Sequence, residues 1–128
     1  MNEIRIVVMG SHDWTKYSSV SKVLDYYISQ FPNYRKIIFV SGTCPGVDML
    51  GERYAYEHDF EIREFPLEKK KYGNAAIENR NQRILNYITA DNSHAVLFAF
   101  WNGKSKGTKD MLRRAKKNNI EIHKVMVR

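Results

Sequence analysis

The stretch Phe100-Trp101-Asn102-Gly103-Lys104-Ser105-Lys106-Gly107-Thr108 follows an apolar run at residues 95–100 and precedes a helical pattern through Met111, Leu112 and Ala115. A strand that ends in a loop of glycine, serine, lysine and threonine and then enters a helix is a ready site for an anion. The first N–H groups of the helix lack intrahelical partners, and the helix dipole favours negative charge there. The stretch therefore predicts a strand, an anion-binding loop and a helix.

Two earlier stretches repeat this arrangement. They are Val7-Val8-Met9-Gly10-Ser11-His12 and Phe39-Val40-Ser41-Gly42-Thr43-Cys44-Pro45-Gly46. Glycines in such loops permit positive φ angles and a close approach of the backbone to a phosphate group. Three loops of this kind in one small domain predict a phosphate-bearing ligand.

Strand and helix patterns alternate along the chain. We expect strands at residues 4–9, 37–40, 60–65, 95–100 and 120–127. We expect a first helix with the apolar face Val20, Val23, Leu24, Tyr27, Ile28 and Phe31, closed by Pro32-Asn33. Further helices are expected at about 45–58, with Pro45 in the first turn, at about 77–88 and at about 106–118, and a polar, lysine-rich connection is expected at 67–72. Strands that alternate with helices of this length predict parallel βαβ units with right-handed crossovers.

The expected fold class is therefore α/β. We expect a single Rossmann-like, three-layer domain over residues 1–128, with a mainly parallel five-stranded sheet and helices on both faces. Pro66 indicates that the strand at 60–65 lies near a sheet edge, because proline cannot donate to a strand ladder. In such sheets ligands bind outside the carboxyl ends of the strands, where the strand order reverses. The first and fourth strands would flank that point, and all three loops would converge on it.

The composition excludes several classes of protein. A chain of 128 residues with 43% hydrophobic content predicts one globular domain. Its single cysteine excludes an internal disulfide framework and a cysteine-based zinc cluster. The four histidines show no metal-ligand spacing, so we expect no metal site. The apolar run at 4–9 is too short to span a bilayer and no secretory leader is evident, so we expect a soluble cytoplasmic protein without a membrane partner.

The charge predicts an anionic partner. The formal net charge is +7, and two clusters, Lys69-Lys70-Lys71 and Arg113-Arg114 with Lys116-Lys117, carry much of the excess. A solvated loop and the outer face of the last helix would explain both clusters. Nucleic-acid binding is the rival explanation.

Five blocks of sequence carry a resemblance to a known family. They are Gly10-Ser11-His12-Asp13-Trp14, Ser41-Gly42-Thr43-Cys44-Pro45-Gly46-Val47-Asp48, Phe65-Pro66 with Tyr72-Gly73-Asn74-Ala75-Ala76, Asn79-Arg80-Asn81, and Trp101-Asn102-Gly103-Lys104-Ser105-Lys106-Gly107-Thr108. In order and spacing they resemble the SLOG superfamily, the Rossmann-like group that contains LOG-type nucleotide hydrolases and DNA-processing protein A. Within that group the chain is most similar to the small YspA-like branch.

The resemblance implies a nucleotide or nucleotide-derived ligand, such as an ADP-ribose-like signal, and no other cofactor. Homo-oligomers are common in the superfamily, so a homo-oligomer is a further expectation from the resemblance. The residues expected to bind the ligand are Gly10, Ser11, His12, Trp14, Ser41, Gly42, Thr43, Gly46, Asp48, Arg80, Asn81, Trp101, Gly103, Ser105, Gly107 and Thr108.

Several of these residues also have a purely structural explanation. Ser105 and Thr108 suit either a phosphate contact or a helix cap. Arg80 and Asn81 would point into the cleft, where Arg80 suits a bidentate phosphate contact, or they would lie on a helix surface.

The acidic and aromatic candidates are equally open. Asp48 would bind a ribose hydroxyl or stabilise the start of the second helix through its dipole. Trp101 would stack on a base and Trp14 would close a loop over it, or both would serve as core or rim aromatics. The residue types alone do not separate these roles.

The resemblance to LOG-type hydrolases bears on catalysis. Their motif Gly-Thr-x-x-Glu supplies the glutamate assigned to cleavage of the glycosidic bond. Here the segment reads Gly107-Thr108-Lys109-Asp110-Met111, and a thioether can neither act as a base nor stabilise an oxocarbenium-like centre. Asp48, Glu78 and Asp110 are the remaining candidates for a catalytic carboxylate.

Three functional hypotheses follow. The first is a binding module that senses or sequesters a nucleotide, because the phosphate loops are intact and the catalytic glutamate is missing. The second is an N-glycosidase or a deoxyribosyltransferase-like enzyme that uses one of the three remaining carboxylates. The third, ranked last, is single-stranded nucleic-acid binding, which the positive charge and the similarity to DNA-processing protein A suggest.

Overall fold

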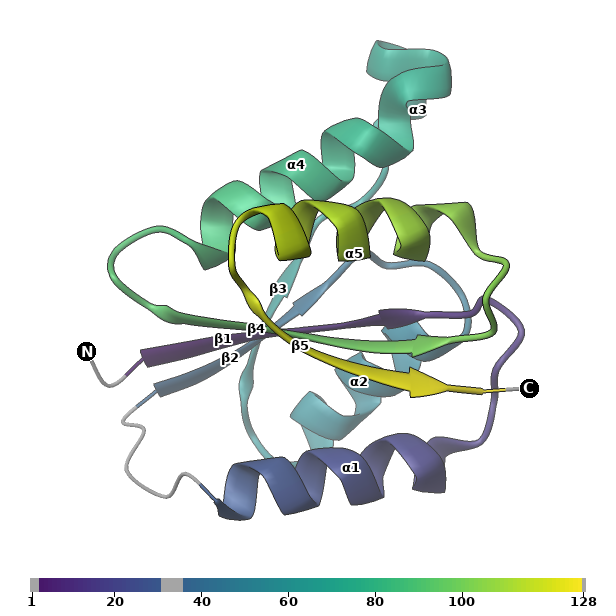
Figure 1. Ribbon diagram of the computed structural model, residues 1–128. Coiled ribbons are helices and arrows are strands. Elements are labelled where there is room, and N and C mark those ends of the chain that lie inside the picture. Colours follow the sequence, from purple (N-terminus) through teal and green to yellow (C-terminus); the bar gives the residue numbers. More distant parts are fainter. Residues whose placement is uncertain (1–2, 31–35, 128) are drawn as a thin grey trace.

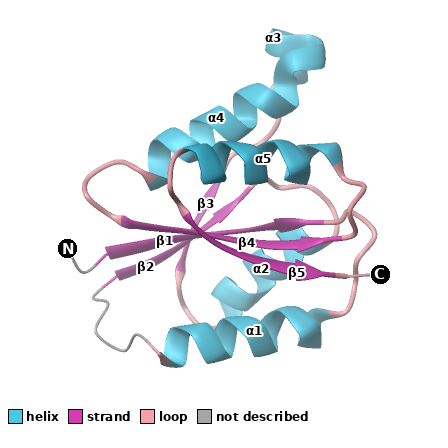
Figure 2. Ribbon diagram, viewed as in Figure 1, coloured by secondary structure: helices cyan, strands magenta, loops and turns pink. Residues whose placement is uncertain are grey.

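The computed structural model describes residues 3–30 and 36–127, and it has three layers (Figures 1 and 2). The strands are β1 (Glu3–Gly10), β2 (Lys36–Ser41), β3 (Glu61–Glu64), β4 (His94–Trp101) and β5 (Glu121–Met126). The helices are α1 (Tyr17–Ser29), α2 (Val47–Glu57), α3 (Lys69–Tyr72), α4 (Ala76–Ile88) and α5 (Lys106–Lys117), with a 3-10 turn, η1, at Gly73–Ala75. Figure 2 shows the sheet between α1 and α2 on one side and α4 and α5 on the other. The α/β class and the helices on both faces are confirmed.

The sheet has the strand order β3-β2-β1-β4-β5. All neighbouring strands run parallel, so the sheet is wholly parallel rather than mainly so. The chain builds outward from β1 to β2 and β3, and then returns to place β4 on the other side of β1. Ile4 of β1 is aligned with Ile37 of β2 on one side and with His94 of β4 on the other. The strand order therefore reverses between β1 and β4, as expected.

The central strand β1 feeds two separate cores because its successive side chains point to opposite faces of the sheet. Ile6 and Val8 pack into the cluster beneath α1 and α2, whereas Val7 packs into the cluster beneath α4 and α5. Ile84 of α4 and Met111 of α5 are fully buried in the second cluster. A strand covered on both faces explains the apolar run near the start of the sequence.

Two boundaries differ from the sequence prediction. Pro45 does not lie in the first turn of α2, because the helix begins at Val47 after Gly46, whose φ of 82° turns the chain just before the helix. Residues 69–72 form the short helix α3 instead of an irregular connection, in keeping with the good helix propensity of lysine.

The end of the first helix was also expected later in the chain. α1 ends at Ser29. The expected face residue Phe31 and the predicted stop at Pro32-Asn33 lie outside the described residues.

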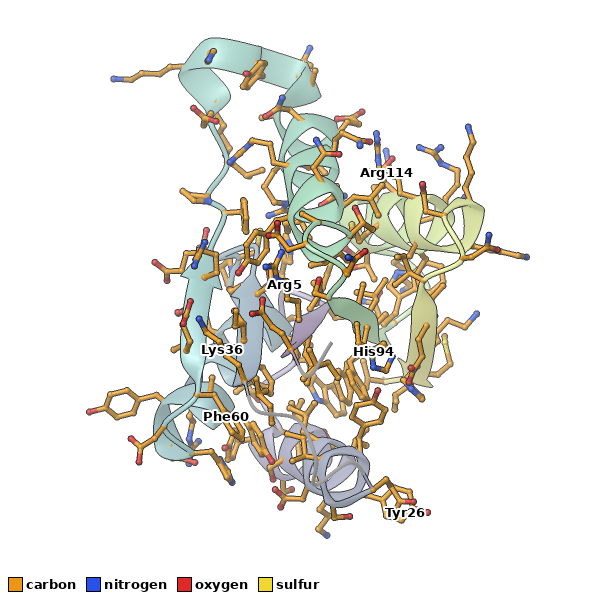
Figure 3. All side chains as sticks on the ribbon, turned by 90° about the vertical axis from the view of Figure 1, so that its left-hand side faces the viewer. Arg5, Tyr26, Lys36, Phe60, His94 and Arg114 are labelled. Atoms are coloured by element: carbon orange, nitrogen blue, oxygen red, sulfur yellow. The ribbon has the colours of Figure 1, made fainter. Side chains whose placement is uncertain are left out.

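A buried arginine, Arg5, lies near the amino-terminal end of the central strand β1 and is labelled in Figure 3. Its Nε donates to Oε2 of Glu3 at 2.7 Å, and its Nη2 donates to Oδ2 of Asp91 at 3.0 Å. Its Nη1 donates to the backbone carbonyl of Tyr87, and its guanidinium carbon lies 4.2 Å from the centre of the Tyr87 ring. The charge of Arg5 is thus compensated entirely within the fold.

Candidate functional site

A cleft of about 560 Å³ lies at the carboxyl ends of the strands, where the order of β1 and β4 reverses. In Figure 1 the carboxyl ends of β1 and β4, and the loops that follow them, lie at the right. The cleft is lined by His12, Asp13, Cys44, Leu67, Ile77, Arg80, Asn102, Lys104, Ser105, Lys106 and Gly107. These residues come from all three predicted loops, from the start of α4 and from the segment before α3. The predicted convergence of the loops is therefore present.

Arg80 of α4 is buried in the wall of the cleft, with 3% of its surface exposed. Its Nη1 donates to the carbonyl oxygen of Gly42 at 2.8 Å, and its Nε donates to Oδ1 of Asn81 at 2.9 Å. Across residues 3–30 and 36–127, no carboxylate oxygen lies within the 4.0 Å ion-pair distance of Arg80. A buried guanidinium without an ion pair is costly unless an anion compensates it.

Asn81 has a different role from its neighbour, because successive helical residues point about 100° apart. Its side chain is fully buried, and its Nδ2 donates to the carbonyl of Gly107 at 3.0 Å and to Oδ2 of Asp110 at 2.9 Å. These bonds fix α4 against the first turn of α5. Arg80 thus faces the cleft, whereas Asn81 holds the helix that forms its wall.

The N-terminus of α5 forms one side of the cleft. Ser105 is the N-cap, and its Oγ accepts a hydrogen bond from the amide of Thr108 at 3.4 Å. The side chain of Asn102 accepts from the amides of Lys104 and Ser105, at 2.8 and 3.2 Å. The first-turn amides of Lys106 and the following residue have no partner inside the helix, as at any helix start. The capping role that the sequence suggested for Ser105 is present, and phosphate contact by Ser105 or Thr108 stays a prediction.

The β1 loop is joined to the other two loops by Ser11, which is buried. Its Oγ accepts from the amide of Asn102 at 2.9 Å, and its carbonyl accepts from the amide of Val47 at 3.1 Å. A Cβ on Gly46 would lie 2.2 Å from that same carbonyl oxygen, and a Cβ on Gly10 would lie 2.0 Å from the carbonyl oxygen of Phe100. The glycines therefore allow the loops to pack together, and their contact with a ligand stays a prediction.

The β2 loop is held by Ser41 and Asp48. Oγ of Ser41 accepts from the amide of Thr43 at 3.0 Å, and Oδ2 of Asp48 accepts from the amide of Cys44 at 3.2 Å. Burial raises the pKa of Asp48 to about 6, although the amide hydrogen bond and the charge of Arg80 act in the opposite direction. Asp48 is 1% exposed and does not line the cleft, so its carboxylate serves the loop in this structure.

The two tryptophans lie outside the cleft wall. Nε1 of Trp14 donates to Oγ of Ser19 at 3.0 Å, and the ring packs against the core beneath α1 and α2. Nε1 of Trp101 donates to the carbonyl of Ser105 at 3.1 Å, and the ring lies near Lys124. Base stacking by either ring stays a prediction.

The carboxylates considered for catalysis also lie away from the cleft wall. Oδ1 of Asp110 accepts from Arg113 at 2.6 Å and its Oδ2 accepts from Arg114 at 2.7 Å. Burial would raise the pKa of Asp110, but these hydrogen bonds and the one from Asn81 hold it below its ordinary value. Glu78 is exposed in the first turn of α4, and Met111 is fully buried in the core. Asp110 is therefore part of the packing between α4 and α5.

Sequence reasoning missed several residues of the cleft wall. Lys104 and Lys106 belong to the loop that first indicated an anion site, so their charge was a usable signal. Asp13 stands inside a recognised block but was not among the expected ligands, and it is the carboxylate among the residues that line the cleft. Leu67 and Ile77 come from segments without a motif, and only the folded chain brings them to the site.

Metal-ligand clusters and membrane-spanning helices are both absent from the described part of the chain. Within it, no group of three or more histidine, cysteine, aspartate or glutamate side chains is arranged to hold a metal ion. Of the helices formed by residues 3–30 and 36–127, none is long and apolar enough to cross a membrane.

Comparison with known families gives one match. The profile of the YspA, cpYpsA-related SLOG family matches residues 4–72, which is more than half of the chain. No curated protein and no solved structure matches the chain. The matched segment runs from β1 to α3 and includes the first two loops, whereas α4 with Arg80 and the loop before α5 lie beyond it. The chain belongs to the YspA, cpYpsA-related SLOG family.

Proposed function

We propose that this protein binds a nucleotide or nucleotide-derived ligand by a phosphate group in the cleft between the β1 and β4 loops, as a sensor or a sequestering module. The observation that carries the proposal is the buried guanidinium of Arg80, which lines the cleft and has no carboxylate within ion-pair distance in the described chain. A phosphate would supply a direct ion-pair partner and accept hydrogen bonds from a planar guanidinium.

The surroundings of Arg80 suit a phosphate monoester or diester. Lys104 and Lys106 stand exposed at the rim, and the first turn of α5 directs unpaired amides toward the same space. The combined positive field would attract a multiply charged anion from solution. Phosphate esters are the common small anions that match several cations and a helix N-terminus together.

Two apolar residues of the cleft lining suit the less polar part of such a ligand. Leu67 and Ile77 both line the cleft, and Ile77 is 38% exposed, which is high for a large aliphatic side chain. The volume of about 560 Å³ falls within the range of small-molecule sites. An apolar surface beside a cationic one supports a ligand with a base or sugar joined to a phosphate, such as an ADP-ribose-like signal.

The proposal favours binding over cleavage. The LOG-type glutamate position is Met111, whose side chain is buried in the core. Asp48 and Asp110 are engaged by the fold, and Glu78 is exposed outside the cleft wall. The phosphate-binding parts of the family pattern are thus supported more strongly than the catalytic part.

Isothermal titration against a panel of ligands tests the proposal. The panel is ADP-ribose, NAD, cyclic dinucleotides, nucleoside monophosphates, ribose 5-phosphate and a single-stranded oligonucleotide, each at low and high salt. We expect saturable binding of at least one small nucleotide and competition by inorganic phosphate. The absence of binding across the panel would overturn the proposal. Binding of the oligonucleotide alone, with a steep loss at high salt, would support nucleic-acid binding instead.

A second candidate function is cleavage of an N-glycosidic bond. It is favoured by the position of Asp13, a carboxylate that lines the cleft beside His12. A carboxylate at this place could stabilise an oxocarbenium-like centre or activate water. The test is release of free base from nucleoside monophosphates, which Asp13→Asn should abolish while binding persists. A flat time course at high protein concentration would remove this candidate.

A further inference from the structure

The single cysteine of the chain, Cys44, lies in the wall of the cleft and is partly exposed. Its Sγ is 3.6 Å from Nη1 of Arg80. Its backbone amide donates to Oδ2 of Asp48 at 3.2 Å, and the preceding Thr43 adopts a positive φ of 64°. The loop therefore holds the thiol at a fixed place next to a buried cation.

A second, independent observation points to a ligand at the same place. Nη1 of Arg80 contacts Gly42 and Cys44, and its Nε contacts Asn81, but its Nη2 has no hydrogen-bond partner among residues 3–30 and 36–127. Arg80 as a whole is 3% exposed and lines the cleft, so this donor belongs to the cleft wall and has no partner there. Lys104 and Lys106 add two exposed positive charges to the rim.

Chemistry connects the two observations. The thiolate is the reactive form of cysteine, and reactive cysteines are partly exposed beside positive groups. A cleft lined with cations also raises the local concentration of anionic reagents, by a factor that ranges from about ten to about a thousand. A thiol in such a cleft should therefore react preferentially with electrophiles that carry negative charge.

We propose that Cys44 is a modification site for anionic disulfides such as glutathione disulfide. The thiolate of Cys44 attacks one sulfur of the disulfide, a bond forms between that sulfur and Sγ, and the other half leaves as glutathione thiolate. The carboxylates of the attached group would face Arg80, Lys104 and Lys106, and its bulk would fill the cleft. Because the chain has one cysteine, release needs an external thiol.

The modification would exclude the phosphate-bearing ligand from the same space. The inference therefore rests on the proposed anion-binding cleft, although the exchange reaction itself needs no nucleotide. It makes occupation of the cleft dependent on the ratio of oxidised to reduced low-molecular-weight thiols.

Charge-selective alkylation of the whole folded chain tests the proposal. We would measure the rates at which iodoacetate, an anion, and neutral iodoacetamide modify Cys44, and divide the iodoacetate rate by the iodoacetamide rate. The same ratio for the chain unfolded in urea gives the reference, in which the cleft is absent. We expect the ratio for the folded chain to exceed the reference by about tenfold and to fall toward it at high salt.

Variants separate the effect of the cleft from the effect of net charge. Lys104→Gln with Lys106→Gln should lower the ratio severalfold, whereas Lys116→Gln with Lys117→Gln, which removes the same charge from the far end of α5, should leave it unchanged. Arg80→Gln should lower it furthest, and the rim variants keep the test valid if that variant does not fold. Equal ratios in the folded and unfolded chains would overturn the proposal.

Incubation with glutathione disulfide completes the test. Intact mass should show one glutathionyl group on the folded chain, none on Cys44→Ser, and complete reversal by a reducing thiol. If nucleotides bind but folded Cys44 stays unmodified, this inference fails while the proposed function stands. If Cys44 forms the adduct with the expected charge selectivity but no nucleotide binds, the proposed function fails while the modification site stands.

Discussion

Two buried arginines lie at opposite ends of the same parallel sheet, and they differ in how their charge is met. Arg5, 5% exposed, has Glu3 and Asp91 as ion-pair partners. Arg80, 3% exposed, has a carbonyl, an amide and a thiol as neighbours but no carboxylate within ion-pair distance in the described chain. The buried charge at the amino-terminal end of the sheet is thus paired within the fold, whereas the one at the carboxyl-terminal end has no ion-pair partner in the described chain.

Under the proposed function, this difference separates a structural charge from a ligand-binding one. Both side chains are equally hidden from solvent, so burial alone does not distinguish them. The partners do, because Arg5 forms direct ion pairs, whereas Arg80 attracts Asp48 only from beyond ion-pair distance, and an incompletely compensated buried charge costs stability. Functional sites often retain such local costs in stability.

The largest expected effect comes from replacing each arginine by methionine. Arg80→Met should weaken binding of the tightest nucleotide in the panel by about 100-fold, or roughly 3 kcal/mol, because it removes a buried charged contact. Arg5→Met should leave the Kd within about twofold, because distant sites act independently. Titration calorimetry of both variants measures the two dissociation constants.

The two methionine variants should rank in the opposite order when the free energy of unfolding is measured. In phosphate-free buffer, Arg5→Met should lower the free energy of unfolding by about 2–3 kcal/mol, because its hydrogen bonds to charged groups are lost. Arg80→Met should lower it less, because the loss of contacts is offset by removal of a buried charge that has no direct ion pair. Urea unfolding checks this order. Equal losses of affinity and of stability in both variants would show that the comparison is wrong.

The second effect concerns pH at the cleft end of the molecule. The folded chain keeps the proton of Asp48 up to a pKa of about 6, whereas the ordinary value is 3.8. Between these values the folded state binds more protons, so the free energy of unfolding should fall as the pH rises, by up to about 3 kcal/mol in total. Asp48→Asn should remove this fall, which urea unfolding at several pH values would reveal.

One further variant and one contrasting carboxylate sharpen that result. The charge of Arg80 lowers the pKa of Asp48, so Arg80→Met should move the midpoint of the fall to higher pH. Asp110 is the opposite case, because its pKa is held low and its contribution to stability is lost as the pH falls. An unchanged pH profile in Asp48→Asn would mean that this carboxyl is not the group that titrates.

A smaller effect is expected from crowding Arg80 without replacing it. A Cβ on Gly42 would lie 2.5 Å from Nη1 of Arg80 and 2.8 Å from Oδ2 of Asp48. Gly42→Ala should therefore displace the guanidinium and weaken nucleotide binding by about tenfold, which matches an overpacking cost of about 1–2 kcal/mol. Titration calorimetry of the variant gives the change in Kd.

The matched control is Gly73→Ala. Gly73 has a φ of 50°, and a Cβ on it would point into open space, with no neighbouring atom within 4 Å. This substitution should cost about 1 kcal/mol of stability from backbone strain alone. The Kd of Gly73→Ala should equal that of the unmodified protein. If Gly42→Ala also keeps that affinity, Arg80 is not part of the binding site.

The smallest effect is expected at the rim of the cleft. Lys104→Gln and Lys106→Gln should each weaken binding by about twofold to fivefold, since exposed charge pairs contribute about 0.2–1 kcal/mol. The effect should vanish near 1 M salt, where the screening length is about 3 Å. Lys116→Gln, on the far end of α5, serves as the control at both salt concentrations. A loss of affinity that salt does not reduce would argue against a purely electrostatic rim.

Most of the fold could be predicted from the sequence, because β1 and β4 carry apolar residues for two faces and the helices carry them for one. The boundaries near Pro45 and Lys69 were harder, since they depend on where the chain must turn to meet a distant loop. Gly46 illustrates this, because its turn places Val47 against Ser11, a contact that no local pattern encodes.

The location of the cleft at the carboxyl ends of β1 and β4 was also predictable, but the orientation of its side chains was not. Arg80 and Asn81 are adjacent in sequence, and only the exact start of α4 decides which of them faces the cleft. Likewise, the hydroxyl of Ser11 is engaged by the amide of Asn102 from another loop, and the carboxylate of Asp48 is engaged by the amide of Cys44 in its own loop. Whether these oxygens are available to a ligand therefore depends on the folded loops.

The pairing of β1 with β4 also has a consequence for biosynthesis. Ser11 and the amide of Asn102 that it accepts from are 91 residues apart in the chain. During translation β1 leaves the ribosome well before β4. The side of β1 that pairs with β4 therefore stays unpaired until this distant part of the chain has been made. A nascent chain that stops before β4 lacks one wall of the cleft, so the proposed ligand binding requires that synthesis has passed the loop between β4 and α5.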